Sequence, residues 1–165
     1  MNISEHSRVW IYQANRTLNP GEVEQIQQKL NRFTSEWLAH GHELLAYSEI
    51  RYNQFIILSV DEQQAGATGC SIDKSVQFML ELEKEFNINL FDRFQLAYRD
   101  GDKIETINRE NFQNLIHSGK IDAETIVFNN LVSTRKALAT NWEVQMKDSW
   151  HASVFTLSNG IVKGI

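Results

Sequence analysis

The sequence has almost no cysteine, no long hydrophobic run and fewer basic than acidic side chains, and each deficit argues against a class of protein. Its one cysteine, Cys70, cannot form a disulfide within the chain, which fits a protein of the reducing cytosol. The longest apolar stretches, Val9–Tyr12 and Phe55–Leu58, are much too short to cross a bilayer. The first residues lack a cationic start followed by an apolar run, so we expect no signal peptide and a cytoplasmic location.

The charge balance argues against nucleic acid as a partner. The 165 residues include 16 lysines and arginines and 21 acidic residues, a net charge of −5, and the whole excess lies in residues 1–100. Phosphate backbones attract basic surfaces, and neither part of the chain provides one. The aromatic residues Trp10, Tyr12 and Phe55 on two expected strands are therefore interpreted as core residues rather than as base-stacking residues. We expect no nucleic-acid partner and no membrane partner.

What the sequence does contain is a clear order of hydrophobic periods. It predicts strand, helix, strand, strand, helix, strand, which is the split βαβ pattern of ferredoxin-like α+β domains. Val9–Tyr12 and Phe55–Leu58 are apolar without alternation and are expected to be central strands, whereas Leu44–Arg51 is more mixed and suits an edge strand. The expected elements, in chain order, are Arg8–Ala14, Asn19–His40, Leu44–Arg51, Phe55–Val60, Ser71–Phe86 and Phe94–Arg99.

The rest of the chain is expected to add a strand and a helical segment to this core. The Asp100-Gly101 turn predicts a fifth strand over Lys103–Ile107, and a helical C-terminal segment then packs on the sheet. Because both faces of the central strands are apolar, we expect residues 108–155, a partner subunit, or both to cover the open face. The length predicts a single domain over residues 1–155, followed by a tail over 156–165.

The first candidate site is a thiol beside a glycine-rich turn. Cys70 lies where the second predicted helix begins, and the unpaired N–H groups and dipole of a helix start favour a nucleophilic thiolate. A nucleophile also needs a base, for which His151 or His117 is the downstream choice, and Asp148 is placed to orient His151. A small enzyme that uses Cys70 is one interpretation, and a buried, inert cysteine is the other.

The same turn suggests a site for a small anionic ligand without catalysis. Gly69 allows the backbone to bend, the N–H groups from Ser71 to Lys74 point forward, and Lys74 adds a positive charge. Asp73 stands where a Walker loop has glycine and would repel phosphate, so the segment is not a Walker motif. An ordinary capped turn is the alternative.

Metal binding is not indicated by the histidines. His40 and His42 are spaced like a pair of ligands, but His6, His117 and His151 are scattered, and no third ligand can be named. His40 is instead interpreted as a cation that complements the negative end of the first helix. We expect neither a metal nor another cofactor.

Four segments carry a family resemblance: Tyr52–Phe55, Gly69–Asp73, Val127–Leu131 and Lys147–His151. Together they resemble a family of short bacterial proteins often labelled "ABC transporter ATPase", over a span from about Ser7 to Phe155. The resemblance implies a stand-alone cytosolic protein without established catalytic residues. The label implies nucleotide binding, but the chain has no Walker loop, no acidic metal-holding strand end and no LSGGQ-like signature.

The sequence therefore leaves three functions open. The leading interpretation is a non-enzymatic protein that binds a small anionic ligand or a protein partner and that pairs with a second copy through its sheet. The alternatives are a small enzyme with Cys70 as nucleophile and His151 as base, and a nucleotide-binding protein.

Overall fold

The computed structural model describes residues 3–156, and their contacts form two compact units. The first unit contains the residues up to Asp92 together with Ser133–Lys136, and the second contains Arg93–Val132 and the residues from Ala137 onward. Each unit combines helices with antiparallel sheet, so the predicted mixed α+β class is confirmed. The single domain expected over residues 1–155 stays a prediction, and the tail expected over 156–165 lies outside the described residues except for Thr156.

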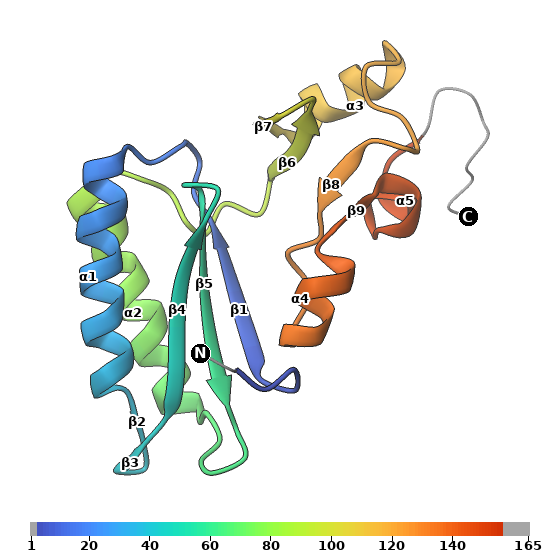
Figure 1. Cartoon of the computed structure of the whole chain (residues 1–165). Helices are drawn as coiled ribbons and strands as arrows, with labels where there is room; N and C mark the ends of the chain where they lie inside the picture. The colour runs from blue at the N-terminus through green and yellow to red at the C-terminus, as the bar shows by residue number, and fades with distance from the viewer. Residues whose placement is uncertain (1–2, 157–165) are drawn as a thin grey trace. The chain divides into compact units, whose positions relative to one another are not determined.

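The first unit is a three-stranded sheet with two helices on one face. Its elements are β1 (Arg8–Gln13), α1 (Pro20–Glu36), β2 (Leu38–Ala39), β3 (His42–Glu43), β4 (Leu45–Arg51), β5 (Phe55–Asp61) and α2 (Gly69–Phe86). The strands lie in the order β1-β5-β4 and pair antiparallel (Figure 1). All residues of β5 but the last are buried, which confirms Phe55–Leu58 as part of a central strand, and β4 is at one end of the sheet as predicted. Val9–Tyr12 was also expected to be central, but β1 is the other end of this three-stranded sheet.

Alternate residues of the sheet face the helices and form the core of this unit. Ile56, Leu58 and Val60 of β5 are fully buried and pack with Ile26 and Leu30 of α1. Burying a side chain of this size stabilises the fold by roughly 2 kcal/mol. This layer therefore holds α1 against the sheet.

The start of α1 has the sequence pattern of a capping box, an asparagine followed three residues later by a glutamate, and the structure contains that box. Asn19 Oδ1 accepts a hydrogen bond from Glu22 N at 2.8 Å, and Glu22 Oε1 accepts one from Asn19 N at 3.0 Å. This reciprocal capping box, with Pro20 in the first turn, satisfies donors that the helix itself leaves open. Arg16 binds both Glu22 oxygens, at 2.8 and 2.7 Å, and this hydrogen bonding lowers the pKa of Glu22 from 4.5 to about 2.

The end of α1 differs from the prediction. The helix expected over Asn19–His40 stops at Glu36, because Trp37 turns into the core and the chain then forms the β2–β3 hairpin. His40 and Gly41 occupy its turn with φ values of 51° and 79°, the left-handed pair that a type I′ hairpin requires. His40 is thus a turn residue rather than the cation at the end of the helix.

The last strand of the expected ferredoxin-like pattern belongs to a different sheet. The segment predicted as Phe94–Arg99 forms β6 (Gln95–Asp100), which pairs with other strands of the second unit and not with β1. At the outer side of β1 lies Ser133–Lys136 instead: Val9 N donates to Ser133 O at 2.9 Å, and Arg135 N donates to Ser7 O at 2.9 Å. The sequence pattern correctly predicted a strand at Phe94–Arg99, but it did not predict with which strands this segment pairs.

The second unit is a four-stranded antiparallel sheet in the order β7-β6-β8-β9 with short helices. Its further elements are β7 (Lys103–Asn108), α3 (Arg109–His117), β8 (Ile126–Phe128), α4 (Arg135–Asn141, whose first two residues belong to the first unit), β9 (Glu143–Gln145), the 3₁₀ helix η1 (Met146–Asp148) and α5 (His151–Val154). The strand predicted over Lys103–Ile107 is present as β7, with Gly101 in the turn at a φ of 62°. It pairs with β6 in this second sheet, and so it does not extend the sheet of the first unit as expected. Phe112, Val127 and Met146 are fully buried in the core of this unit.

Candidate functional site

The predicted anion site lies at the N-terminus of α2, where three backbone N–H groups are already hydrogen-bonded to side chains of this chain. Thr68 Oγ1 accepts from Ser71 N at 3.3 Å, and Ser71 Oγ accepts from Thr68 N at 2.7 Å. Glu62 Oε2 accepts from Ala67 N at 2.9 Å, so a carboxylate of the chain itself binds the loop before the helix. The helix begins at Gly69 with Thr68 as its cap, whereas the sequence had suggested a start at Ser71.

The other residues expected in that site lie on the first turns of α2. Gly69, Asp73 and Lys74 are exposed, whereas Ser71 is buried in the capping box. Neither Gly66 nor Gly69 has a positive φ, so the loop does not need the conformational freedom of glycine. An ordinary capped turn describes this geometry, and ligand binding there stays a prediction.

Removing the cap of α2 tests this description. Thr68→Ala is expected to lower the free energy of unfolding by about 1 kcal/mol, because Ser71 N loses its acceptor. Urea unfolding followed by circular dichroism measures the change. Thr68→Ser retains the hydroxyl and is expected to unfold like the original chain, and equal stability of all three chains would contradict the capping role.

The predicted catalytic pair is divided between the two units. Cys70 is an exposed residue of α2 in the first unit, so its interpretation as a buried core residue is wrong. His151 is the first residue of α5 in the second unit, and its side chain is buried. Catalysis by these two residues together stays a prediction.

The surroundings of His151 keep its ring neutral. Its Nδ1 lies 2.8 Å from Ser149 Oγ, and the ring stacks on Trp150 with centroids 3.8 Å apart. Burial lowers the pKa of His151 from 6.5 to about 4, and its Nε2 has no hydrogen-bond partner among the described residues. Asp148, which was expected to orient His151, is exposed, and the side chain that contacts His151 Nδ1 is that of Ser149. A general base works best with a pKa near neutral pH, and the pKa of this imidazole is well below that.

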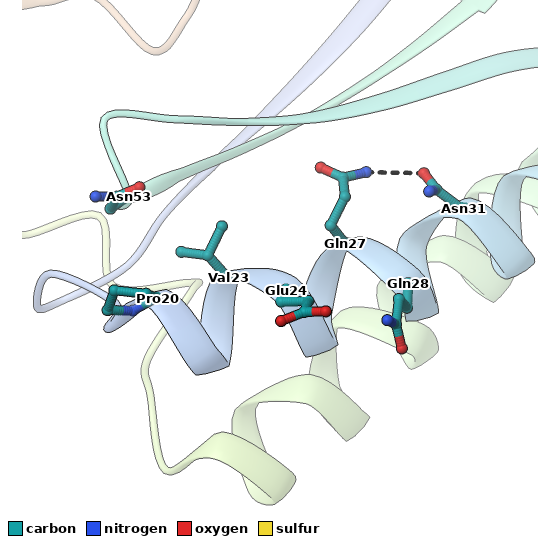
Figure 2. Close-up of a pocket in the computed structure, with 7 residues that line it drawn as sticks. All are labelled: Pro20, Val23, Glu24, Gln27, Gln28, Asn31 and Asn53. Carbon is teal, nitrogen blue, oxygen red and sulfur yellow. Dashed lines mark hydrogen bonds between the residues drawn. The ribbon is translucent and has the colours of Figure 1, made fainter.

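A groove that the sequence did not predict runs beside α1 (Figure 2). Its volume is about 450 Å³. Its walls carry four side-chain amides, one carboxylate and no basic group. The lining residues are Pro20, Val23, Glu24, Gln27, Gln28, Asn31 and Asn53. We call this feature the α1 groove.

Two of its amides are joined to the neighbouring strand. Gln27 Nε2 donates to Asn31 Oδ1 at 2.8 Å, as Figure 2 shows, and to Ser48 Oγ of β4 at 3.2 Å. Ser48 Oγ in turn donates to Asn31 Oδ1 at 3.4 Å. Gln27 Oε1 and Asn31 Nδ2 take part in none of these bonds, so the pair retains one acceptor and one donor group.

The outer edge of β4 is open beside this amide pair. Ala14 N donates to Gln54 O at 2.8 Å as a first bond of the β1–β5 ladder. Hydrogen-bonded pairs alternate along antiparallel strands, so the even-numbered residues of β5 bond to β1 and its odd-numbered residues bond to β4. In the register of β4 with β5, the partners of these odd-numbered residues are the odd-numbered residues of β4. Ala46, Ser48 and Ile50 consequently direct their backbone N–H and C=O groups outward, and no strand within residues 3–156 pairs with them.

Comparisons with known proteins do not assign a function to this site. No protein-family model, curated protein or solved structure matches the chain. Within residues 3–156, no helix is long and apolar enough to span a membrane. In the same part of the chain, no three His, Cys, Asp or Glu side chains are grouped so as to hold a metal ion. His40 and His42 are both exposed in the β2–β3 hairpin.

The α1 groove had one signal in the sequence. Val23, Gln27 and Asn31 follow each other at intervals of four, which places them on one face of a helix next to the buried stripe. Amides on a helix face usually indicate a solvated surface, so this spacing alone does not distinguish a binding site from an ordinary exposed face. What sets this face apart is the open edge of β4 beside it, which the spacing does not predict.

Proposed function

We propose that the first unit binds an extended segment of another polypeptide, which adds as a strand to the outer edge of β4 and lies along the α1 groove. The observation that carries this proposal is the coincidence of three outward backbone positions, Ala46, Ser48 and Ile50, with an amide-lined groove. In strand addition, backbone hydrogen bonds provide affinity and the adjoining side chains provide selectivity. The protein is then a non-enzymatic interaction module.

The composition of β4 supports this role. Proteins protect free sheet edges with proline, lysine, inward-pointing charges or bulges, because open edges recruit other strands. The outward residues of β4 are alanine, serine and isoleucine, and its 7 residues pair with β5 without a bulge. The edge of β1 differs, since Ser133 and Arg135 hydrogen-bond to it.

The arrangement of the first unit explains why β4 is the free edge. We infer that this unit is ferredoxin-like in its first three strands and two helices, with Thr134 at the position of the fourth strand. The supporting observations are the order β1-β5-β4, the helices on one face, and the antiparallel bridge between Arg8 and Thr134. Strand addition is thereby directed to β4.

The charge of the α1 groove restricts its occupant. Glu24 is the one charged residue in the lining, and no lysine or arginine contributes to it. An acidic segment would be repelled without any compensating ion pair. The occupant is therefore a neutral or basic segment.

Proline at Ser48 is expected to prevent capture of such a segment. The substitution removes an outward N–H, and the ring obstructs the approaching strand, whereas an edge strand tolerates proline at an outward position. Peptides are selected from a random library displayed on phage against the full chain, and labelled copies are then titrated by fluorescence anisotropy. We expect Ser48→Pro to weaken their binding roughly tenfold or more.

Ser48→Ala is the matched control, since it loses the hydroxyl but retains the backbone N–H. It is expected to bind the selected peptides, and thermal melting of both variants confirms that the fold is intact. Recovery of no peptide, or equal binding to Ser48→Pro and the original chain, would overturn the proposal. A dimer that dissociates in Ser48→Pro would assign the edge to a second copy instead.

A further inference from the structure

The amide pair on α1 points to the chemistry of the captured segment. Resting on the strand addition proposed above, we infer that the segment carries asparagine or glutamine opposite Ser48, and that Gln27 and Asn31 bind its carboxamide through two hydrogen bonds. This inference names the partner by a side chain and assigns two specificity-determining residues.

The register follows from the geometry of β4. Ser48 directs its side chain toward α1, because its Oγ contacts both Gln27 and Asn31. Residues opposite each other in a sheet project to the same face, with Cβ atoms about 5 Å apart. The side chain opposite Ser48 therefore lies beside the amide pair, and the small serine leaves room for it.

The hydrogen-bonding capacity of the pair selects a carboxamide. Gln27 Oε1 remains an acceptor and Asn31 Nδ2 remains a donor once the bonds between α1 and β4 are made. If both amides were turned over, the remaining groups would again be one donor and one acceptor. A primary carboxamide offers an N–H and a C=O in one plane and satisfies both groups at once.

Other side chains satisfy the pair less well. A carboxylate accepts only and is repelled by Glu24, whereas a lysine ammonium donates only. An apolar side chain would cover both polar groups without replacing their hydrogen bonds to water. On either side of the amide, the occupant faces Ala46 and Ile50, which are packed against the apolar core, so apolar residues fit two positions away.

The test compares peptides that differ at one position. A selected peptide with asparagine or glutamine opposite Ser48 is titrated beside the same peptide carrying leucine there. The original chain is expected to prefer the amide peptide roughly tenfold, and the double variant Gln27→Met/Asn31→Leu is expected to bind both peptides equally. Gln25→Met, at an exposed position of the same helix outside the α1 groove, is expected to retain the preference.

The outcomes separate this inference from the proposed function. Binding that requires an unblocked β4 edge but shows no amide preference, or a preference that survives in the double variant, would overturn the inference and leave strand addition in place. Peptide binding that is indifferent to Ser48→Pro would overturn both.

Discussion

Replacing Trp37 by alanine is expected to destabilise the first unit by about 4 kcal/mol. Trp37 is 2% exposed, and its ring lies 5.1 Å from that of Phe33 and 6.0 Å from that of Trp10. Its Nε1 donates a buried hydrogen bond to Ser71 O at 2.8 Å. One side chain thus joins α1, β1 and α2, and its removal leaves a cavity among all three. Urea unfolding followed by circular dichroism measures the loss.

Phenylalanine at the same position separates packing from hydrogen bonding. Trp37→Phe retains most of the ring contacts and removes the donor to Ser71 O, so we expect a loss of roughly 1–2 kcal/mol. A loss as large as that of Trp37→Ala would show that the hydrogen bond, and not the packing, dominates. Unchanged stability in both variants would contradict the assignment of Trp37 to the core.

Trp37 also shows what helical periodicity predicts and what it does not. Val23, Ile26, Leu30, Phe33 and Trp37 recur at intervals of three and four, a spacing that predicts one apolar stripe on a helix. Ile26, Leu30 and Trp37 are in the core, and Val23 and Phe33 are partly buried against it. The backbone nevertheless leaves the helix at Glu36, since a side chain can continue the apolar stripe from a non-helical residue. Gly41 is compatible with a helix end just after His40, but it lies in the turn of the β2–β3 hairpin, beyond the true end of the helix.

Strand partners were harder to predict than strands. The segments of β5 and β6 were both expected as strands, and both are strands. Sheet membership depends on contacts between distant segments, and the alternation within a strand carries no information about them. Thr134, at the edge of β1, had no strand pattern that would have indicated that position.

Reactive side chains can be identified in a sequence more readily than groups that act through their arrangement in the fold. Cys70 and His151 attracted attention because their side chains are reactive, but the burial of His151 reflects packing and a serine hydrogen bond. The amides Gln27 and Asn31 are unreactive, and their significance depends on the neighbouring strand. Residue type predicts reactions better than it predicts recognition, which arises from an arrangement of ordinary groups.

Acid is expected to destabilise the second unit through His151 by up to about 3 kcal/mol. The ordinary pKa of histidine is 6.5, and burial lowers that of His151 to about 4. Between these values the unfolded chain binds a proton that the folded chain does not, so the free energy of unfolding falls as the pH falls. The contribution is complete above pH 6.5 and lost at about pH 4, at 1.36 kcal/mol for each pKa unit.

Two variants isolate this effect from the titration of carboxylates. His151→Phe keeps an aromatic ring against Trp150 and Phe112 but cannot be protonated, so its stability is expected to change less between pH 7 and about pH 4.5. His42→Gln removes an exposed histidine and is expected to retain the full acid sensitivity. Glu22, whose pKa is lowered to about 2 by Arg16, contributes only below its ordinary value of 4.5 and thus outside this interval. Equal acid sensitivity of His151→Phe and the original chain in urea unfolding would show that the buried imidazole is not the group that titrates.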